Sequence, residues 1–284
     1  MKGTALTGAT LTGIGAIAVW AFLALLGRWA APLPPLQVTA LAFAVGGTLG
    51  FGIVAARGGL ERLRQPPLAW AHGVGGLFGY HALYFAAITW APPVTANLLN
   101  YLWPLLIVLL SAPVLGMRLG PRRLAGTALG FAGCAVLIGG GADLPTGSAL
   151  GLVCALAAAL VWATYSVASR RMAAVPTEAV AGFCLGAAVL AGLAHLGFET
   201  WMQPGPGQWL AVLLLGMGPV GAAFFLWDVG MKRGDPRLLG TLAYATPVAS
   251  TVLLVVAGEG VLDARVGIAT ALVAGGGMLA ATAR

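Results

Sequence analysis

The strongest constraint on this chain is a series of long apolar stretches, separated by short breaks that carry charge, proline or glycine. Each stretch runs for roughly 20 residues, the length that an α-helix needs to cross the hydrocarbon core of a bilayer. A β-barrel would instead alternate apolar and polar residues over about ten positions. We therefore predict an all-α membrane protein with ten transmembrane helices at residues 6–27, 35–56, 67–89, 92–115, 122–140, 148–170, 178–198, 208–230, 236–257 and 262–282.

The charges are few and unevenly placed. Only 8% of the residues are charged, whereas a soluble domain carries about 25%. Of the 15 basic residues, 13 fall at the termini or in connections on one side of the predicted membrane: Lys2, Arg57, Arg62, Arg64, Arg118, Arg122, Arg123, Arg170, Arg171, Lys232, Arg233, Arg237 and Arg284. Because basic loops stay in the cytoplasm, both termini are predicted to be cytoplasmic. This bias also accounts for the net charge of +7 without a nucleic-acid partner.

The two halves of the sequence share residues at a nearly constant offset. The Val-Trp-Ala around Trp20 recurs around Trp162, 142 residues further on, and Tyr101 with Pro104 recurs as Tyr244 with Pro247, an offset of 143. Five is an odd number of helices, so a second copy enters the membrane upside down. We predict one five-helix repeat at residues 1–143 and an inverted one at 144–284, an organisation found in many secondary transporters.

These features together resemble a known family. Five plus five helices, a Trp in the first and sixth, prolines in the fourth and ninth, and Gly258-Glu259-Gly260 after the ninth are similar to EamA-type members of the drug/metabolite transporter superfamily. The first repeat departs from this pattern with Gly116-Met117-Arg118. The aromatic residues of the third and fourth helices are most similar to those of bacterial aromatic amino-acid exporters. The resemblance implies export of aromatic and other neutral amino acids through the bacterial inner membrane.

Aromatic and polar side chains gather at mid-depth in the predicted helices, where a polar atom facing lipid would lack a partner. Tyr80 and Tyr84 lie one helical turn apart, and Asn97, Asn100 and Tyr101 share one helix face. We expect these residues to line a central cavity that opens alternately to each side, with rings that stack on the cargo and amides that orient it. The predicted substrate-binding residues are Trp20, Tyr80, His81, Tyr84, Asn97, Asn100, Tyr101, Trp103, Trp162, Tyr165 and Tyr244.

Two of the predicted helices have a different composition. Helices 122–140 and 262–282 lack Tyr and Trp, and they carry small residues at every fourth position: Gly126, Gly130 and Cys134 in one, Gly267, Ala271 and Gly275 in the other. Such stripes allow close helix contact. We predict that these two helices form a scaffold and that helices 6–27, 67–89, 92–115, 148–170, 208–230 and 236–257 contribute to the cavity.

Other functions remain open at this stage. A multidrug or other metabolite carrier of the same fold is the nearest alternative, and a membrane-embedded enzyme is the alternative from another class. An enzyme would need paired carboxylates, a nucleophile with a base, or metal ligands, whereas the titratable group at mid-depth is His81. His81 is either functional or a core histidine with a hydrogen-bond partner. We expect no catalytic residue, metal or cofactor, and we expect a monomer whose partners are the lipid bilayer and a small-molecule substrate.

Overall fold

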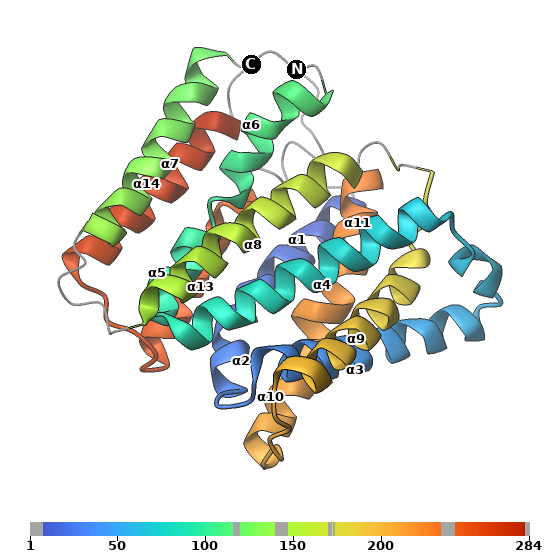
Figure 1. The fold of residues 1–284 in the computed structure, drawn as a ribbon. Helices are drawn as coiled ribbons and strands as arrows, with labels where there is room; N and C mark the ends of the chain where they lie inside the picture. Colours follow the sequence, from blue (N-terminus) through green and yellow to red (C-terminus); the bar gives the residue numbers. More distant parts are fainter. Residues whose placement is uncertain are drawn as a thin grey trace.

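The computed structural model describes residues 8–115, 120–139, 147–169, 172, 174–233 and 242–281. Within these residues all regular secondary structure is helical (Figure 1). The helices are α1 (Gly8–Trp20), α2 (Leu23–Trp29), α3 (Pro35–Ala56), the 3₁₀-helix η1 (Leu60–Leu63), α4 (Pro67–Trp90), α5 (Pro93–Asn100), α6 (Trp103–Leu115), α7 (Pro121–Gly139), α8 (Ser148–Ser169), α9 (Ala179–Phe198), α10 (Pro206–Met217), the π-helix η4 (Gly218–Ala222), α11 (Ala223–Arg233), α13 (Ala245–Val256) and α14 (Ala264–Ala281).

Several helical stretches have the length and apolar character of membrane spans. Five of them meet both criteria: Gly8–Trp29, Pro35–Ala56, Ser148–Ser169, Ala179–Phe198 and Pro206–Gly230. Shorter apolar helices cover Leu124–Gly133, Ala245–Val256 and Ala264–Leu279. Since lipid offers no hydrogen bonds to the backbone, helices satisfy their own peptide groups across a bilayer. The structure thus has the character of a multi-pass, all-helical membrane protein.

Four of the helices predicted as continuous are interrupted within the described residues. Residues 6–27 break between α1 and α2, residues 92–115 break between α5 and α6, and residues 208–230 contain the π-helix η4. The break after α5 lies at Tyr101, three residues before Pro104, and a turn at Tyr244 likewise lies three residues before Pro247. Because proline has no N–H to donate to the carbonyl four residues earlier, the helix is weakened at corresponding places in the two halves.

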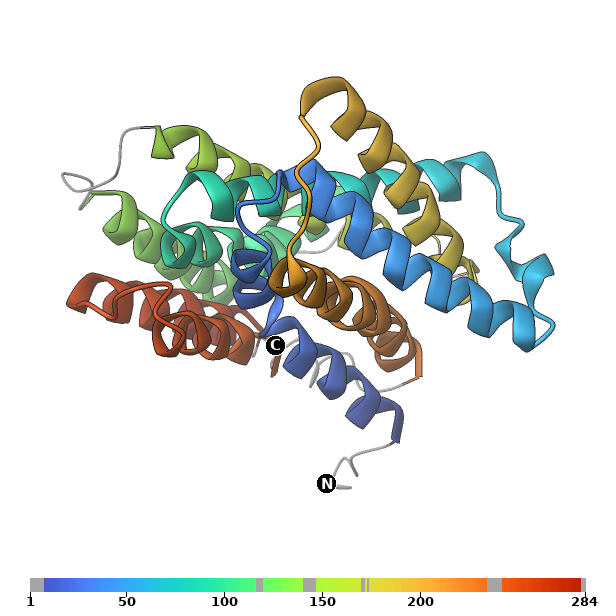
Figure 2. The same ribbon diagram turned by 90° about the horizontal axis from the view of Figure 1, so that it is seen from below.

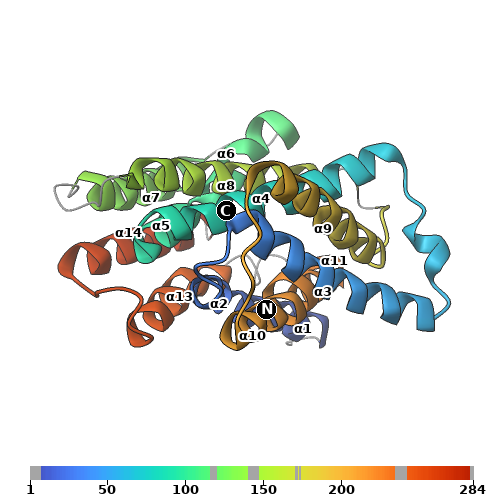
Figure 3. The same cartoon turned by 60° about the horizontal axis from the view of Figure 1, so that its bottom comes forward.

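The helices pack in pairs that come from distant parts of the sequence. The α3 helix runs along α9, α7 along α14, α4 along α8, and α1 along α11. The pair of α7 and α14 lies at one side of the molecule and the pair of α3 and α9 at the other, with α4, α5 and α8 between them (Figure 3). Figure 2 shows the same separation from below, with α14 in red and α3 in blue at opposite sides.

Glycines allow α7 and α14 to approach each other closely. A Cβ atom on Gly276 of α14 would lie 2.5 Å from the backbone oxygen of Gly126 in α7, and one on Gly133 would lie 3.0 Å from the oxygen of Ala269. A Cβ on Gly267 or Gly275 would meet nothing within 4 Å. The predicted stripe of α14 is therefore wrong in register, since Gly276 rather than its neighbour faces α7. Of α7's predicted stripe, Gly126 and Gly130 lie at this contact.

One end of the bundle is tied together by polar contacts. The Glu199 carboxylate accepts hydrogen bonds from the backbone N–H groups of Leu36 and Gln37 at 3.0 and 3.1 Å, at the start of α3. An anion is favourable at a helix N-terminus. At the end of α2, Arg28 Nε lies 3.1 Å from Glu259, and its guanidinium donates to the carbonyl of Ile88 at 3.4 Å. These bonds join the ends of α2, α3 and α4 to distant loops.

Candidate functional site

A small cavity of about 30 Å³ lies among the central helices. It is lined by Trp20, Leu23, Tyr80, His81, Tyr84, Asn100, Tyr101, Trp103, Trp162, Phe224, Ala243 and Thr246. These residues all come from the six helices that we predicted would contribute, and none comes from helices 122–140 or 262–282. In the described residues, the lining of this space therefore agrees with the predicted division between scaffold and lining helices, and its role in transport stays a prediction.

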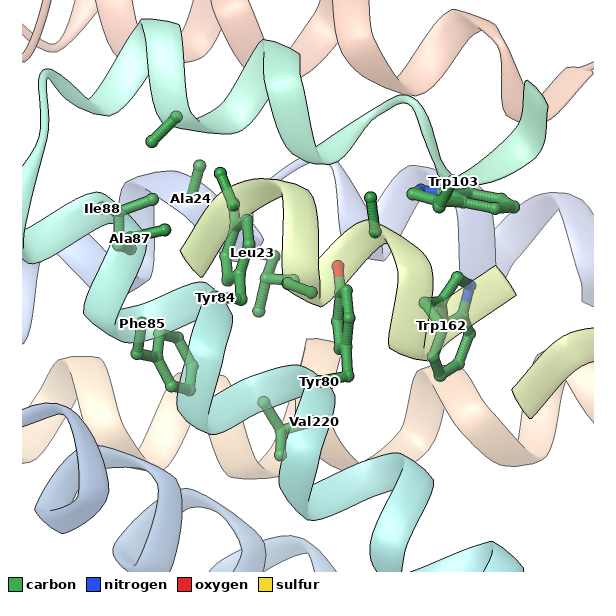
Figure 4. Packing of buried hydrophobic residues seen from close by; sticks show 14 of the residues in the cluster. Leu23, Ala24, Tyr80, Tyr84, Phe85, Ala87, Ile88, Trp103, Trp162 and Val220 are labelled. Atoms are coloured by element: carbon green, nitrogen blue, oxygen red, sulfur yellow. The ribbon is translucent and has the colours of Figure 1, made fainter. Parts of the chain in front are cut away.

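Aromatic rings make up most of the cavity wall. The Trp162 ring of α8 lies 5.0 Å from Tyr80, 6.1 Å from Trp20 and 6.4 Å from Trp103, measured between centroids. Figure 4 shows Tyr80 and Tyr84 on α4, with Trp103 and Trp162 close together and their rings nearly perpendicular. Trp20 is fixed by a 3.1 Å hydrogen bond from its indole N–H to the Pro219 carbonyl in η4. Rings from α1, α4, α6 and α8 thus meet around one space.

Buried polar side chains form a connected layer beside the rings. Tyr84 donates its hydroxyl hydrogen to Asn97 Oδ1 at 2.8 Å, and Asn97 Nδ2 donates to Ser250 of α13 at 3.0 Å. Asn100 Nδ2 donates to the Tyr80 hydroxyl oxygen at 3.0 Å. Because Asn97 and Asn100 are at most 1% exposed, these bonds replace hydration that burial removed. The layer joins α4 to α5 and α13.

Two polar atoms of residues in the cavity wall have no hydrogen-bond partner in the part of the chain that the structure describes. His81 is 1% exposed, and its Nδ1 lies 2.9 Å from the Leu77 carbonyl oxygen. Its Nε2 has no hydrogen-bond partner, and neither does Oδ1 of Asn100. A buried polar atom left in this way costs free energy. Both residues line the cavity, so a ligand entering it can provide the missing bonds.

Three of the eleven predicted site residues lie outside this lining. Asn97 is behind the wall, bonded to Tyr84. Tyr165 lines a second cavity of about 80 Å³ with His72 and stacks on that imidazole at 4.6 Å. Tyr244 is buried against α14, where a Cβ on Gly277 would lie 2.0 Å from its ring. The other eight predicted residues share the central cavity, so symmetry does not bring Tyr244 there with Tyr101.

Sequence reasoning missed four lining residues: Leu23, Phe224, Ala243 and Thr246. Phe224 is the most important of them, since its ring lies 5.9 Å from Trp20 and Trp162 and 5.6 Å from His81. A phenylalanine carries no polar atom that must find a partner, so mid-depth placement alone did not mark it. Its signal in the sequence was its distance of three residues from Trp227, which places both on one helix face.

The size of the cavity is informative about the conformation. Binding pockets for small molecules generally measure about 300–1,000 Å³, whereas this one measures about 30 Å³. Such a space has room for water but not for an aromatic side chain. The central helices must separate before a solute of that size can enter.

Comparisons with known proteins identify the family. The EamA-like transporter family matches residues 7–139 and again residues 149–282. The aromatic amino acid exporter YddG of Ancylobacter novellus is 52% identical over 276 residues, which is 96% of each chain. YddG of Escherichia coli is 26% identical over 87% of this chain and 88% of its own. A solved crystal structure with 51% identity superposes with a TM-score of 0.78 and covers 97% of this chain and 98% of the other. The chain therefore belongs to the EamA-like transporter family, whose members are transporters and not enzymes.

Proposed function

We propose that this protein exports aromatic amino acids through the central cavity. One observation carries the proposal: rings from both halves of the chain line a single space whose wall also contains two buried polar atoms without a partner among the described residues. Aromatic walls bind planar rings by stacking and edge contacts, and the polar atoms bind the amino-acid group. The relative at 52% identity, named as an aromatic amino acid exporter, supports the same cargo.

The topology we infer is ten spans in two inverted repeats, 1–143 and 144–284, with both termini in the cytoplasm of a bacterial cell. The double match to the family supports two repeats. In the proposed repeats, α3 corresponds to α9, α7 to α14, α4 to α11 and α1 to α8. Replacing each helix by its counterpart leaves the pairs α3–α9 and α7–α14 unchanged and converts the pair α4–α8 into α11–α1, so the observed pairs support a two-fold relation between the repeats. The basic connections support the orientation.

Alternating access is the mechanism that this arrangement favours. In the proposed orientation, the contacts of Arg28 with Glu259 and of Glu199 with α3 lie on the outer side. They hold the outer ends of the helices together around a contracted cavity. Moving the lining helices of one half against those of the other would break these contacts, enlarge the cavity and release the cargo outward. The protein would act in the inner membrane as a monomer.

A related amino-acid cargo is the second candidate. A relative from Streptantibioticus cattleyicolor, 29% identical over 85% of this chain and 86% of its own, is named a probable terminal-alkyne amino-acid exporter. That name points to a cargo with the same amino-acid group and a different side chain. A carrier of other amino acids would use the same polar atoms and make less use of the rings.

Transport by the purified protein tests the proposal. Proteoliposomes would be loaded with unlabelled phenylalanine, and the exchange uptake of labelled phenylalanine, tyrosine, tryptophan, leucine and glutamate would be followed with and without a pH gradient. We expect exchange of the three aromatic amino acids above that of empty liposomes, and little exchange of glutamate. Equal exchange of all five, or of none, would show that the cargo is wrong.

Labelling tests the topology separately. Arg122 and Arg265 are the second residues of α7 and α14, at corresponding ends of the two repeats. With a single cysteine at either position, an impermeant thiol reagent applied outside cells should label only the cysteine at position 265. Labelling of both positions from the same side would contradict inverted repeats, whatever the cargo.

A further inference from the structure

The unpartnered atoms of the central cavity have a defined chemical character. A carbonyl oxygen only accepts hydrogen bonds, so the 2.9 Å contact with Leu77 requires that His81 Nδ1 carries the hydrogen. Neutral imidazole has one N–H, and the other nitrogen then bears a lone pair. Nε2 of neutral His81, which has no partner, is therefore an acceptor. The carbonyl of Leu77 fixes this tautomer from within the same helix.

The second unpartnered atom has the same character. Asn100 uses its Nδ2 to donate to the Tyr80 hydroxyl at 3.0 Å, which leaves Oδ1 as its unpartnered atom. An amide oxygen only accepts. Two residues of the cavity wall, from α4 and α5, thus each hold one buried acceptor without a partner among the described residues. A ligand that pairs both must be rich in N–H or O–H groups.

The surroundings favour a cation over a neutral donor. The centroid of the Tyr80 ring lies 4.8 Å from that of His81 and 5.0 Å from that of Trp162, so aromatic rings surround the His81 imidazole. Ring faces attract an ammonium group. Among the described lining residues there is no Arg or Lys to pair with a carboxylate.

On the basis of the proposed function, we propose that His81 Nε2 and Asn100 Oδ1 form the site for the α-ammonium group of the cargo. Recognition of the amino acid then rests on its amine and its ring, and the carboxylate contributes less. The site should accept aromatic primary amines that lack a carboxylate. It should reject aromatic acids that lack the amine.

Competition against labelled phenylalanine in proteoliposomes of the unaltered protein tests this selectivity. Phenethylamine keeps the ring and the ammonium group, whereas 3-phenylpropanoate keeps the ring and the carboxylate. We expect phenethylamine to compete within about tenfold of phenylalanine and 3-phenylpropanoate to be at least about tenfold weaker, as expected for loss of hydrogen bonds to a charged group. The reverse order would overturn the assignment.

Two variants of His81 test whether its Nε2 atom binds the ammonium group. His81→Leu removes the acceptor and should weaken phenylalanine and phenethylamine alike by about tenfold or more, while His81→Gln keeps an acceptor oxygen and should restore part of that affinity. If His81→Leu weakens tryptophan and tyrosine but leaves phenylalanine unchanged, the acceptors bind ring N–H and O–H groups, and the proposal is wrong.

Binding to the detergent-purified protein separates this inference from the proposed function. Phenethylamine should raise the melting temperature of the unaltered protein and raise that of His81→Leu much less. If no aromatic amino acid is transported while this difference persists, the cargo is wrong and the amine site stands. If phenethylamine protects both proteins equally, the amine site is wrong even where transport is observed.

Discussion

The helices that line the cavity pack in a different way from the two scaffold helices, α7 and α14. The contact between α7 and α14 rests on glycines whose backbones touch, at Gly276 against Gly126 and Gly133 against Ala269. Around the cavity the contacts are between large rings, such as Trp162 with Tyr80 and Trp20. Backbone contact leaves no room for adjustment, whereas rings can change their rotamers and stacking partners. We infer that the contact between the scaffold helices α7 and α14 stays rigid while the residues that line the cavity rearrange around the cargo.

The largest loss of stability should come from a substitution in the contact between the scaffold helices α7 and α14. Gly276→Ala would place a methyl group 2.5 Å from the Gly126 oxygen and 2.8 Å from the Gly130 nitrogen, and overpacking against backbone lowers stability by about 3 kcal/mol. Gly275→Ala is the matched control, since a Cβ there meets nothing within 4 Å and alanine is the better helix former. Thermal unfolding in detergent should separate the two variants, and equal melting temperatures would contradict the contact.

A smaller loss is expected in the hydrogen-bonded layer beside the cavity. Tyr84→Phe leaves Asn97 Oδ1 buried without its donor. Unsatisfied buried groups cost roughly 1–3 kcal/mol, and values within membranes tend toward the low end, so we expect about 1 kcal/mol. A double-mutant cycle with Asn97→Leu measures the pair directly. A coupling energy near zero would mean that the two side chains act independently.

Loss of an aromatic ring from the cavity wall should lower the affinity for cargo and should have a smaller effect on the stability of the scaffold helices α7 and α14. An aromatic contact contributes about 0.5–1.5 kcal/mol beyond area burial, so Trp162→Ala should weaken phenylalanine binding about 2- to 13-fold. The control is Trp209→Ala, because Trp209 is 37% exposed and lies outside the cavity lining. Phenylalanine-dependent protection against unfolding reports the affinities. An equal loss in both variants would point to a general defect.

The smallest effect is expected at an ion pair that joins α2 to the segment before α14. Arg28 of α2 and Glu259, before α14, are partly exposed at 26% and 27%, and such pairs contribute about 0.2–1 kcal/mol. Glu259→Gln should lower stability within that range and less so in high salt. The more exposed Arg62–Glu178 pair provides the comparison, and Glu178→Gln should cost less. A larger loss of stability in Glu178→Gln than in Glu259→Gln would contradict this order.

Much of this protein was determined by the sequence alone. The apolar stretches required helices, because a bilayer provides no partners for peptide groups. The breaks near Pro104 and Pro247 were not predicted, since residues 92–115 and 236–257 were expected to form continuous helices, although the missing N–H of each proline explains them. The mid-depth positions of Tyr80, His81 and Trp162 identified lining residues, because polar atoms avoid lipid.

The tertiary structure alone decided which faces meet. One residue along a helix turns the side chain by about 100°, so helical spacing could not tell Gly275 from Gly276 as the contact with α7. For the same reason, equivalent positions did not guarantee equivalent surroundings: Tyr101 lines the cavity, while Tyr244 packs on Gly277. By contrast, the contact that fixes the tautomer of His81 is local, because the Leu77 carbonyl lies four residues earlier in the same helix. Sequence patterns specify what a helix carries, and only packing specifies what each side chain meets.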